Sequence, residues 1–233
     1  MSDAREAILG SIRRALDRRE PADVAAAAIA SRLANPKANV IPERGQDQGG
    51  EAIERFTFEA ERVNATTERV AALADVPARV RSYLQGANLP SALKVAPDPD
   101  LAGVPWDQEP LLQITTGKAD DHDPVSFTGS FAGVAETGTL VLLSGPESPT
   151  TLNFLPDVHI ALLFTDRVVG SYEDVWARLR ARDGATVMPR VVNWITGPSR
   201  TADIEQTLLL GAHGPRRLHI ILVDEVPAAP EGS

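Results

Sequence analysis

The sequence predicts an α/β protein: a three-layer α/β/α body with a mixed, mostly parallel sheet, preceded by an N-terminal helical appendage. From Gly50 onward, segments with helical periodicity alternate with short apolar or β-branched runs, as in strands joined by helical crossovers. Several of these runs are continuously apolar, which is typical of strands covered on both faces. The chain has 233 residues and 43% hydrophobic content, enough for one sizeable core.

The first part of the chain is expected to be helical. One helix should run to Leu16, with Ser2 or Asp3 as its cap, because apolar side chains recur there every three or four positions. An alanine-rich helix is expected over Ala22–Leu33. Either this part packs on the chain's own core or it is a docking arm for a partner. We assign residues 1–48 to the helical appendage, 49–226 to the α/β domain and 227–233 to a frayed tail.

Within the α/β domain, apolar residues at helical spacing predict helices, and short apolar or β-branched runs predict strands. The predicted helices are Glu51–Val63, Pro77–Gln85, Tyr172–Arg182 and Ala202–Leu210. The predicted strands are Ala92–Ala96, Leu111–Thr115, Val125–Phe127, Leu140–Leu143, Ile160–Phe164, Val191–Ile195 and Leu218–Val223.

Composition argues against several classes of function. The formal charge of -9 disfavours a general grip on nucleic acid, which needs clustered lysine and arginine. Because the chain has no cysteine, it carries no disulfide, thiolate nucleophile or cysteine-ligated cluster, and its four histidines lack the spacing of metal ligands. We therefore expect no metal site and no cofactor in this chain.

The sequence also predicts where the protein works. No stretch approaches the roughly 20 apolar residues that a membrane span needs. The residues Met1–Leu16 mix charged and apolar side chains and lack the continuous apolar run of a signal peptide. A cytoplasmic location is therefore expected.

A glycine- and threonine-rich segment precedes the predicted strand Leu140–Leu143. Its glycines allow close backbone approach, its threonines offer hydroxyl groups, and Glu136 offers a carboxylate that can act as nucleophile or base. The spacing matches neither a Walker loop nor the dinucleotide fingerprint. A bulge or tight bend between strands is the alternative to a ligand site. The candidate ligand-binding residues here are Thr137, Gly138 and Thr139.

A second segment, Ile195–Glu205, follows the order strand, Gly-Pro turn, helix. Free backbone N–H groups at a helix start attract phosphate or carboxylate, and the hydroxyl and guanidinium groups nearby add donors. Asp203 and Glu205 also fit a simpler interpretation, a well-capped helix with acids in its first turn. The candidate ligand-binding residues here are Gly197, Ser199, Arg200 and Thr201.

His213 is the most interesting of the histidines. It lies in a Gly-rich turn that begins at Gly211 and leads into the last predicted strand. An imidazole can act as an acid or a base near neutral pH. A histidine after a helix also commonly makes a backbone hydrogen bond, so a catalytic and a structural role both stay open.

Four segments, taken together in this order and spacing, resemble the LUD domain family. The start of the chain, Ala4–Leu16, also resembles the start of the C-type members of that family. The segments are GVAETGTL at Gly133–Leu140, LPDVHI at Leu155–Ile160, GPSRTADIE at Gly197–Glu205 and GAHGP at Gly211–Pro215.

The resemblance implies a fold and a function. It implies a three-layer body similar to the glucosamine-phosphate isomerase, ribose-phosphate isomerase and CoA-transferase group. It also implies a role in oxidising L-lactate to pyruvate, beside companion lactate utilization proteins of which one carries iron–sulfur motifs. The absence of cysteine suits a non-redox component of such a system.

Three hypotheses about function follow. In the first, the two turns line one pocket for a small anionic metabolite, with Arg200 binding its carboxylate bidentately. In the second, the chain is a stand-alone transferase or isomerase that acts on a CoA thioester or a phosphosugar through Glu136. This hypothesis rests on fold analogy. The third is a purely structural scaffold, which predicts a closed surface without a pocket.

Overall fold

The computed structural model describes residues 2–15, 23–34, 37, 39–183, 188–201, 209–211 and 213–226, and the predicted tail 227–233 lies outside them. The chain divides into two compact units, Met1–Asn39 and Val40–Ser233. The boundary that we predicted after residue 48 falls inside the second unit. Gly45 is buried there, and its carbonyl oxygen approaches Gly170 so closely that a side chain at Gly170 would collide with it.

The first unit contains the two helices expected from the sequence. They are α1 (Ser2–Ala15) and α2 (Asp23–Ala34). Ile8 and Ile12, on the apolar face of α1, are 60% and 49% exposed. Among the described residues no helix is long and apolar enough to cross a membrane.

The second unit is built on a six-stranded sheet in which every neighbouring pair of strands is parallel. Its spatial order differs from the chain order, so the connections must cross over the sheet, as the predicted alternation of helices and strands requires. In spatial order the strands are β1 (Thr66–Val70), β12 (Arg217–Val223), β7 (Val158–Phe164), β4 (Val125–Gly129), β2 (Ala92–Val95) and β3 (Gln113–Thr116).

A smaller, mixed sheet packs beside the parallel one. Its strands β5 and β6 form an antiparallel hairpin, β9 extends the hairpin antiparallel to β6, and β8 pairs parallel with β5. A separate antiparallel pair joins β10 to β11. These strands are β5 (Ala132–Val134), β6 (Thr139–Leu143), β8 (Val168–Val169), β9 (Val192–Ile195), β10 (Arg200–Thr201) and β11 (Leu209–Leu210).

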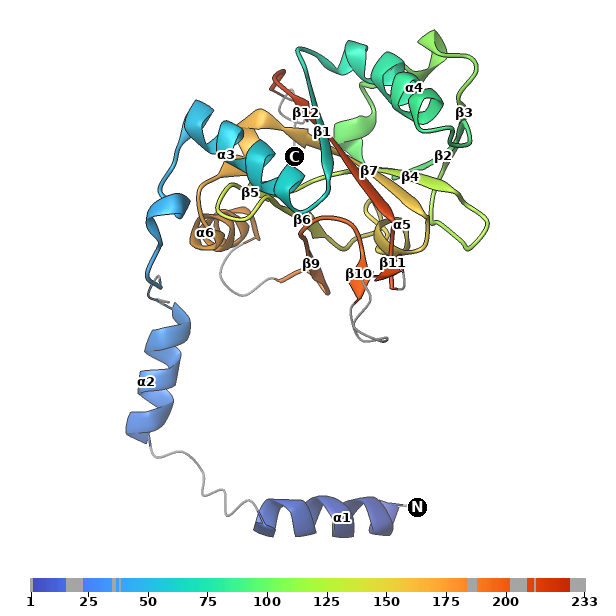
Figure 1. Cartoon of the computed structure of the whole chain (residues 1–233). Helices are drawn as coiled ribbons and strands as arrows, with labels where there is room; N and C mark the ends of the chain where they lie inside the picture. The colour runs from blue at the N-terminus through green and yellow to red at the C-terminus, as the bar shows by residue number, and fades with distance from the viewer. Residues whose placement is uncertain are drawn as a thin grey trace. The chain divides into compact units, whose positions relative to one another are not determined.

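Helices cover both sheets, and the layers are visible in Figure 1. The helix α4 packs on one face of the parallel sheet, α3 and the small sheet cover the other face, and α6 covers the outer face of the small sheet. The helices of this unit are α3 (Gly49–Arg62), α4 (Val76–Gly86), α5 (Thr151–Phe154) and α6 (Tyr172–Asp183). Short 3₁₀ turns lie at Glu43–Gly45, Leu73–Asp75, Pro99–Leu101, Trp106–Gln108 and Thr165–Arg167.

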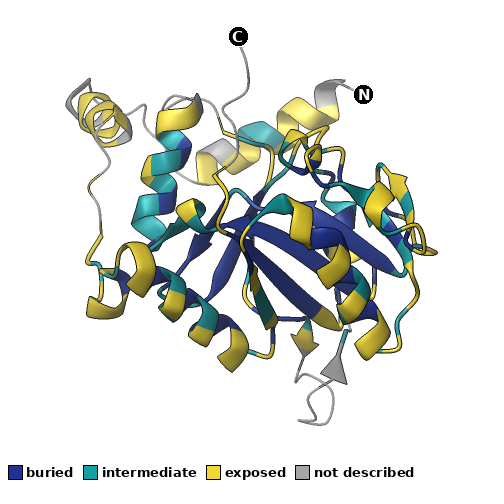
Figure 2. Cartoon of the chain, turned by 90° about the horizontal axis from the view of Figure 1, so that it is seen from above, coloured by how far each residue is buried: buried dark blue, intermediate teal, exposed yellow. Residues whose placement is uncertain are grey.

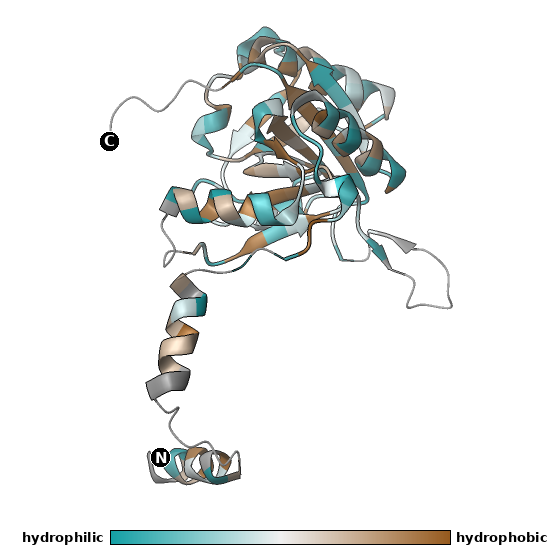
Figure 3. Ribbon diagram, turned by 90° about the vertical axis from the view of Figure 1, so that its left-hand side faces the viewer, coloured by the Kyte–Doolittle hydropathy of each residue, from teal (hydrophilic) through white to brown (hydrophobic). Residues whose placement is uncertain are grey.

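Strand β7 shows how the sequence produces these layers. All seven of its residues are buried. Because side chains alternate across a strand, Ile160, Leu162 and Phe164 enter the core under α4. Ala161 and Leu163 enter the core under α3. The central strands are accordingly dark blue in Figure 2 and mainly hydrophobic in Figure 3.

The helices begin and pack where their sequences dictate. Ala52, Phe56 and Ala60 recur every four residues along α3 and are fully buried. At the start of α6, the Ser171 N–H donates to Asp174 Oδ2 at 2.9 Å, and the Asp174 N–H donates to Ser171 Oγ at 3.3 Å. This reciprocal pair satisfies two backbone donors at the helix start.

The fold class is confirmed, and most predicted elements agree with the structure within a few residues. The prediction of a helix over Ala202–Leu210 is wrong at its end, because Leu209 and Leu210 form β11, and residues 202–208 lie outside the described residues. The strands β1, β5, β8, β10 and β11 were not predicted. The sequence of β1, TTERV, is polar and only its last residue is buried, so it lacks the apolar run by which we recognised the other strands.

Gly138 gives a stability prediction. Its φ is +64°, and a Cβ there would overlap the backbone of Ala60 in α3. Gly138→Ala should therefore lower the free energy of unfolding by at least about 2 kcal/mol, measured by urea denaturation. Gly86→Ala is the matched control. A Cβ at that helical glycine meets nothing within 4 Å, so this variant should be neutral or slightly stabilising. Equal midpoints for the two variants would contradict the prediction.

Candidate functional site

A cavity of about 360 Å³ lies at the amino-terminal ends of β7 and β12, whose early residues His159 and Leu218 line it. We call it the His159 cavity. In Figure 1 the elements around it, α5, β9, β10 and β11, lie together at one edge of the second unit. Its other walls come from the end of α5, from the segment Trp194–Arg200 and from His213–Pro215.

Backbone hydrogen bonds hold these segments together. The Ser199 N–H donates to Pro215 O at 2.8 Å, and the Gly211 N–H donates to Ser199 O at 2.9 Å. The His213 N–H donates to Ser199 Oγ at 3.3 Å. The Arg216 N–H in turn donates to Asp157 O at 2.8 Å, just before β7. Three of the four sequence segments that resemble the LUD family therefore meet at this cavity.

Two buried side chains that line the cavity have polar atoms without a hydrogen-bond partner among the described residues. Asn153 is 1% exposed, and both its Oδ1 and its Nδ2 are unpartnered. His159 is also 1% exposed, and its Nδ1 is unpartnered while Nε2 lies 2.8 Å from Thr128 Oγ1. Leaving such groups unpaired costs stability, so these atoms are suited to receive a bound molecule.

Burial changes the charge state of His159. Desolvation of the imidazolium lowers the pKa of His159 to about 4. The ring is therefore neutral near pH 7 and acts as a hydrogen-bonding group rather than as a cation.

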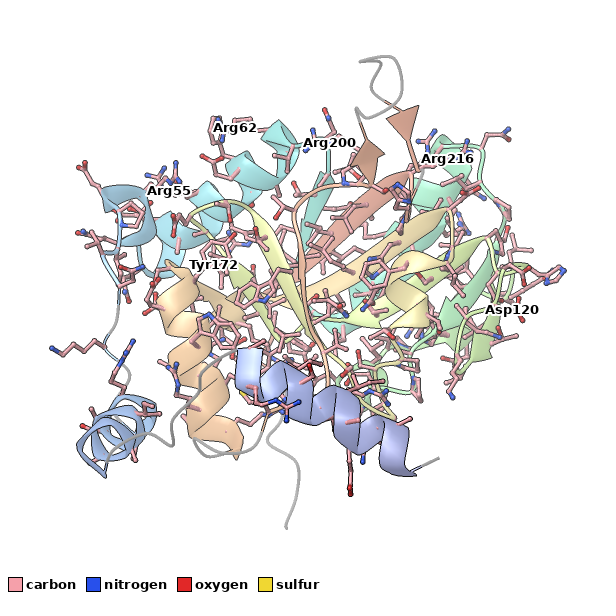
Figure 4. All side chains as sticks on the ribbon, turned by 90° about the horizontal axis from the view of Figure 1, so that it is seen from below. Arg55, Arg62, Asp120, Tyr172, Arg200 and Arg216 are labelled. Atoms are coloured by element: carbon pink, nitrogen blue, oxygen red, sulfur yellow. The ribbon has the colours of Figure 1, made fainter. Side chains whose placement is uncertain are left out.

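The predicted residues of the second turn line this cavity in part. Gly197, Ser199 and Arg200 are in its wall. Gly197 has a φ of +71° and packs against Val63. It therefore contributes only backbone atoms to the cavity wall. Arg200 is exposed and comes from β10, and Figure 4 shows it on the same edge as Arg62 and Arg216.

We predicted that the anion would be bound by the N–H groups at the start of a helix. In the structure the groups available to an anion at this turn are different ones. Arg200 and Thr201 form a β-strand, so the donors in the described part of this turn are side chains and loop N–H groups. Thr201 belongs to β10, and the structure does not describe its side chain. His213 is exposed and lines the cavity. Its catalytic role stays a prediction.

The threonine turn lies next to the cavity but does not line it. Thr137 Oγ1 lies 2.7 Å from Thr139 Oγ1 and 2.7 Å from Tyr172 Oη, so these hydroxyl groups satisfy one another. Thr139 Oγ1 also lies 2.7 Å from Thr196 Oγ1, and Thr196 is in the cavity wall. Gly138 is buried against α3. The two predicted turns are therefore neighbours, and only the second faces the cavity.

Glu136 lies outside the His159 cavity. Its side chain is 11% exposed, and its Oε1 lies 3.5 Å from Nη2 of Arg44. Its backbone N–H donates to Gly170 O at 3.0 Å. The hypothesis that Glu136 is a nucleophile or base stays a prediction, and this surrounding gives it an ion-pair partner instead of a substrate pocket.

Asn153 and His159 were missed as site residues. They are distant in sequence from the Gly-Pro turn, and His159 lies in an apolar run, which made it a poorer candidate than His213. The signal that could have identified Asn153 and His159 was their polarity at positions that the sequence places in or near the core. A buried asparagine and a histidine inside a buried strand both need partners that an apolar core does not supply.

Comparison with known proteins relates part of the chain to a family. Residues 118–223 match the LUD domain. The chain is 39% identical over 108 residues to lactate utilization protein C of Geobacillus thermodenitrificans, covering 46% of this chain and 45% of the relative. It is 34% identical over 131 residues to the protein of the same name from Bacillus velezensis, covering 55% and 53%. An uncharacterized protein of Neisseria meningitidis serogroup B is 42% identical over 97 residues, covering 42% and 41%.

One solved structure shares the fold. The crystal structure of a DUF162 family protein from Deinococcus radiodurans has a TM-score of 0.54 and 22% identity, and the match covers 74% of this chain and 96% of that one. The fold thus defines an α/β protein in which residues 118–223 are similar to the LUD domain. The chain is also similar to lactate utilization protein C, and it spans about half the length of these relatives.

The buried histidines give a pH prediction. In the unfolded chain a histidine has a pKa near 6.5, whereas the folded protein lowers the pKa of His159, and also that of His219, to about 4. Between these values the unfolded chain binds protons that the folded protein excludes. Stability is therefore fully present above about pH 6.5 and lost as the pH falls towards 4.

For His159 alone this loss amounts to at most about 3 kcal/mol. Urea denaturation between pH 4 and pH 7 should show that His159→Gln has a flatter pH dependence than the wild type. His219→Gln should flatten it in the same sense, because the same burial acts on that ring. Identical slopes for the wild type and His159→Gln would show that the buried imidazole is not responsible.

Proposed function

We propose that this chain is a non-redox component of a cytoplasmic L-lactate utilisation system and that the His159 cavity binds a small anionic metabolite. The observation that carries the proposal is the set of unpartnered polar atoms of Asn153 and His159 in a cavity that Arg200 also lines. The relatives named lactate utilization protein C supply the metabolic context.

The chemistry of the wall suits a hydroxy or keto acid. The guanidinium of Arg200 offers two parallel N–H donors to a carboxylate, and such charge-assisted pairs are the strong hydrogen bonds of proteins. The hydroxyl of Ser199 and the imidazole of His213 supply further donors or acceptors. The amide of Asn153 supplies a donor and an acceptor to a hydroxyl or carbonyl group of the ligand.

The size of the cavity also favours a small ligand. Its volume of about 360 Å³ lies near the lower end of the range of ligand pockets, roughly 300–1,000 Å³. A closed scaffold would have no such cavity, so its presence supports binding over a purely structural role.

In the proposal the electrons leave through another protein. Conversion of lactate to pyruvate removes two electrons and two protons, one proton from the hydroxyl group and one from the carbon that bears it, and this chain has no cysteine with which to hold an iron–sulfur cluster. In the proposal a companion lactate utilization protein with iron–sulfur clusters accepts the electrons, while this chain holds or hands over the metabolite.

A stand-alone transferase or isomerase working through Glu136 is the alternative. It has less support, because Glu136 pairs with Arg44 and does not line the cavity. Turnover of acyl-CoA donors or sugar phosphates by the purified protein, lost in Glu136→Gln, would favour it.

Arg200→Ala tests the anion site. Calorimetric titration of the full chain with L-lactate and with pyruvate should show a loss of affinity of about 10- to 100-fold, since a hydrogen bond to a charged group contributes about 1.5–3 kcal/mol. Arg216→Ala is the control, because Arg216 is also an exposed arginine but pairs with Asp157 and does not line the cavity. If neither acid binds to the wild type, or if both variants behave alike, the site assignment fails.

Asn153→Leu separates function from stability. Removing a buried amide that has no partner among the described residues should raise the free energy of unfolding by about 1 kcal/mol, while removing ligand contacts should weaken the binding of L-lactate. In cells that lack the native copy, this variant should restore lactate-dependent growth less well than the wild type. A variant that is more stable and fully active would show that Asn153 is only a packing defect.

A further inference from the structure

A second cavity lies at the opposite ends of the parallel strands. It has a volume of about 570 Å³ and collects residues that follow β2, β4 and β7, namely Asp98, Ser130 and Arg167. We call it the carboxyl-end cavity. Ligands of open α/β sheets bind in the crevice beyond the carboxyl ends of the strands, so its position is typical of a site.

Arg167 ties the walls of this cavity together. Its Nη1 donates to Asp100 Oδ2 and, at 3.2 Å, to Ser130 O. Its guanidinium carbon lies 4.9 Å from the centre of the Phe164 ring. A guanidinium has five N–H donors, so these bonds from one nitrogen leave Arg167 donors for a ligand.

Arg182 brings a second guanidinium group to the same cavity. Its guanidinium carbon lies 5.4 Å from the centre of the Phe131 ring, which holds the group at the cavity wall. Arginine pairs match the geometry of carboxylate and phosphate oxygens.

Ser130 points to a ligand independently of these charges. The residue is 4% exposed, and its Oγ has no hydrogen-bond partner among the described residues. A buried hydroxyl without a partner is costly, and here it belongs to a residue of the cavity wall.

Asp98 also lines the cavity and is held close to the end of β4. Its Oδ1 accepts the Asp100 N–H at 3.0 Å, and a Cβ on Gly129 would come within 2.5 Å of its Oδ2. Glycine at position 129 is thus what admits the carboxyl group. Burial raises the pKa of Asp98 above its ordinary value, although the Asp100 N–H opposes the shift.

We propose that the carboxyl-end cavity binds a polyol that carries one oxyanion, either a phosphate or a carboxylate. The oxyanion pairs with Arg167 and Arg182, while neighbouring hydroxyl groups of the ligand bond to the Asp98 carboxyl and the Ser130 hydroxyl. A carboxyl and a hydroxyl in one cavity wall can accept and donate hydrogen bonds, which is what alcohol groups of a ligand require. The larger volume suits a ligand bigger than the three-carbon acid assigned to the His159 cavity.

Calorimetric titration of the full chain tests this. The probes are sorbitol 6-phosphate and gluconate, with sorbitol and inorganic phosphate as the separate halves of the ligand. At least one of the two anionic polyols should bind saturably, and each half should bind at least about tenfold more weakly, because neither uses both parts of the site. The stronger probe identifies the oxyanion as phosphate or carboxylate.

Two variants assign the binding to this cavity. Ser130→Ala and Asp98→Asn should each lower the affinity for the tighter-binding anionic polyol at least about fivefold, within the usual range for a lost hydrogen bond. Ser130→Ala should keep or raise the melting temperature, because it removes an unpartnered buried hydroxyl, so its loss of binding cannot be ascribed to unfolding.

Two control variants test whether the probe binds in the carboxyl-end cavity and not in the His159 cavity. Asp121→Asn removes a carboxylate from an exposed loop and should bind the probe like the wild type. Ser199→Ala alters the His159 cavity and should also leave the probe's affinity unchanged. The proposal is overturned if neither anionic polyol binds, or if Ser130→Ala and Asp98→Asn both bind it like the wild type.

Discussion

The structure depends on the burial of β7 between two cores. Residues of this strand, like those of its neighbour β12, enter both the core under α4 and the core under α3. On its two edges β7 pairs in parallel with β12 and β4. A strand buried on both faces must be apolar along its length, and VHIALLF departs from that rule only at His159. His159 lies at the amino-terminal end of the strand and lines the His159 cavity.

The two ends of the parallel strands differ in chemistry. At the amino-terminal ends, neutral donors and acceptors and a single exposed arginine surround a small cavity. At the carboxyl ends, carboxylates and arginines surround a larger one, linked by the bonds of Arg167. Strand ends are where the apolar requirement of the core stops and loop residues begin, so polar side chains gather there without disturbing the sheet.

Both cavities contain buried polar atoms that no described residue satisfies: those of Asn153 and His159 in one and of Ser130 in the other. In contrast, the hydroxyl groups of Thr137, Thr139 and Tyr172 are satisfied by one another. A satisfied network rigidifies the fold, whereas an unsatisfied atom is a cost that ligand binding relieves. This difference explains why the threonine turn supports the cavity through Thr196 and does not form its wall.

The sequence by itself determined the fold class, most strands and helices, and the similarity of residues 118–223 to the LUD domain, because continuous apolar runs and glycine-rich turns are local signals. It also marked Gly197, Ser199, Arg200 and His213, which line one cavity. Only the tertiary structure decided that Asn153 and His159 join them and that Thr137 and Glu136 do not. A hydrogen bond that is made or missing depends on which distant segments meet, and one sequence carries no local trace of that.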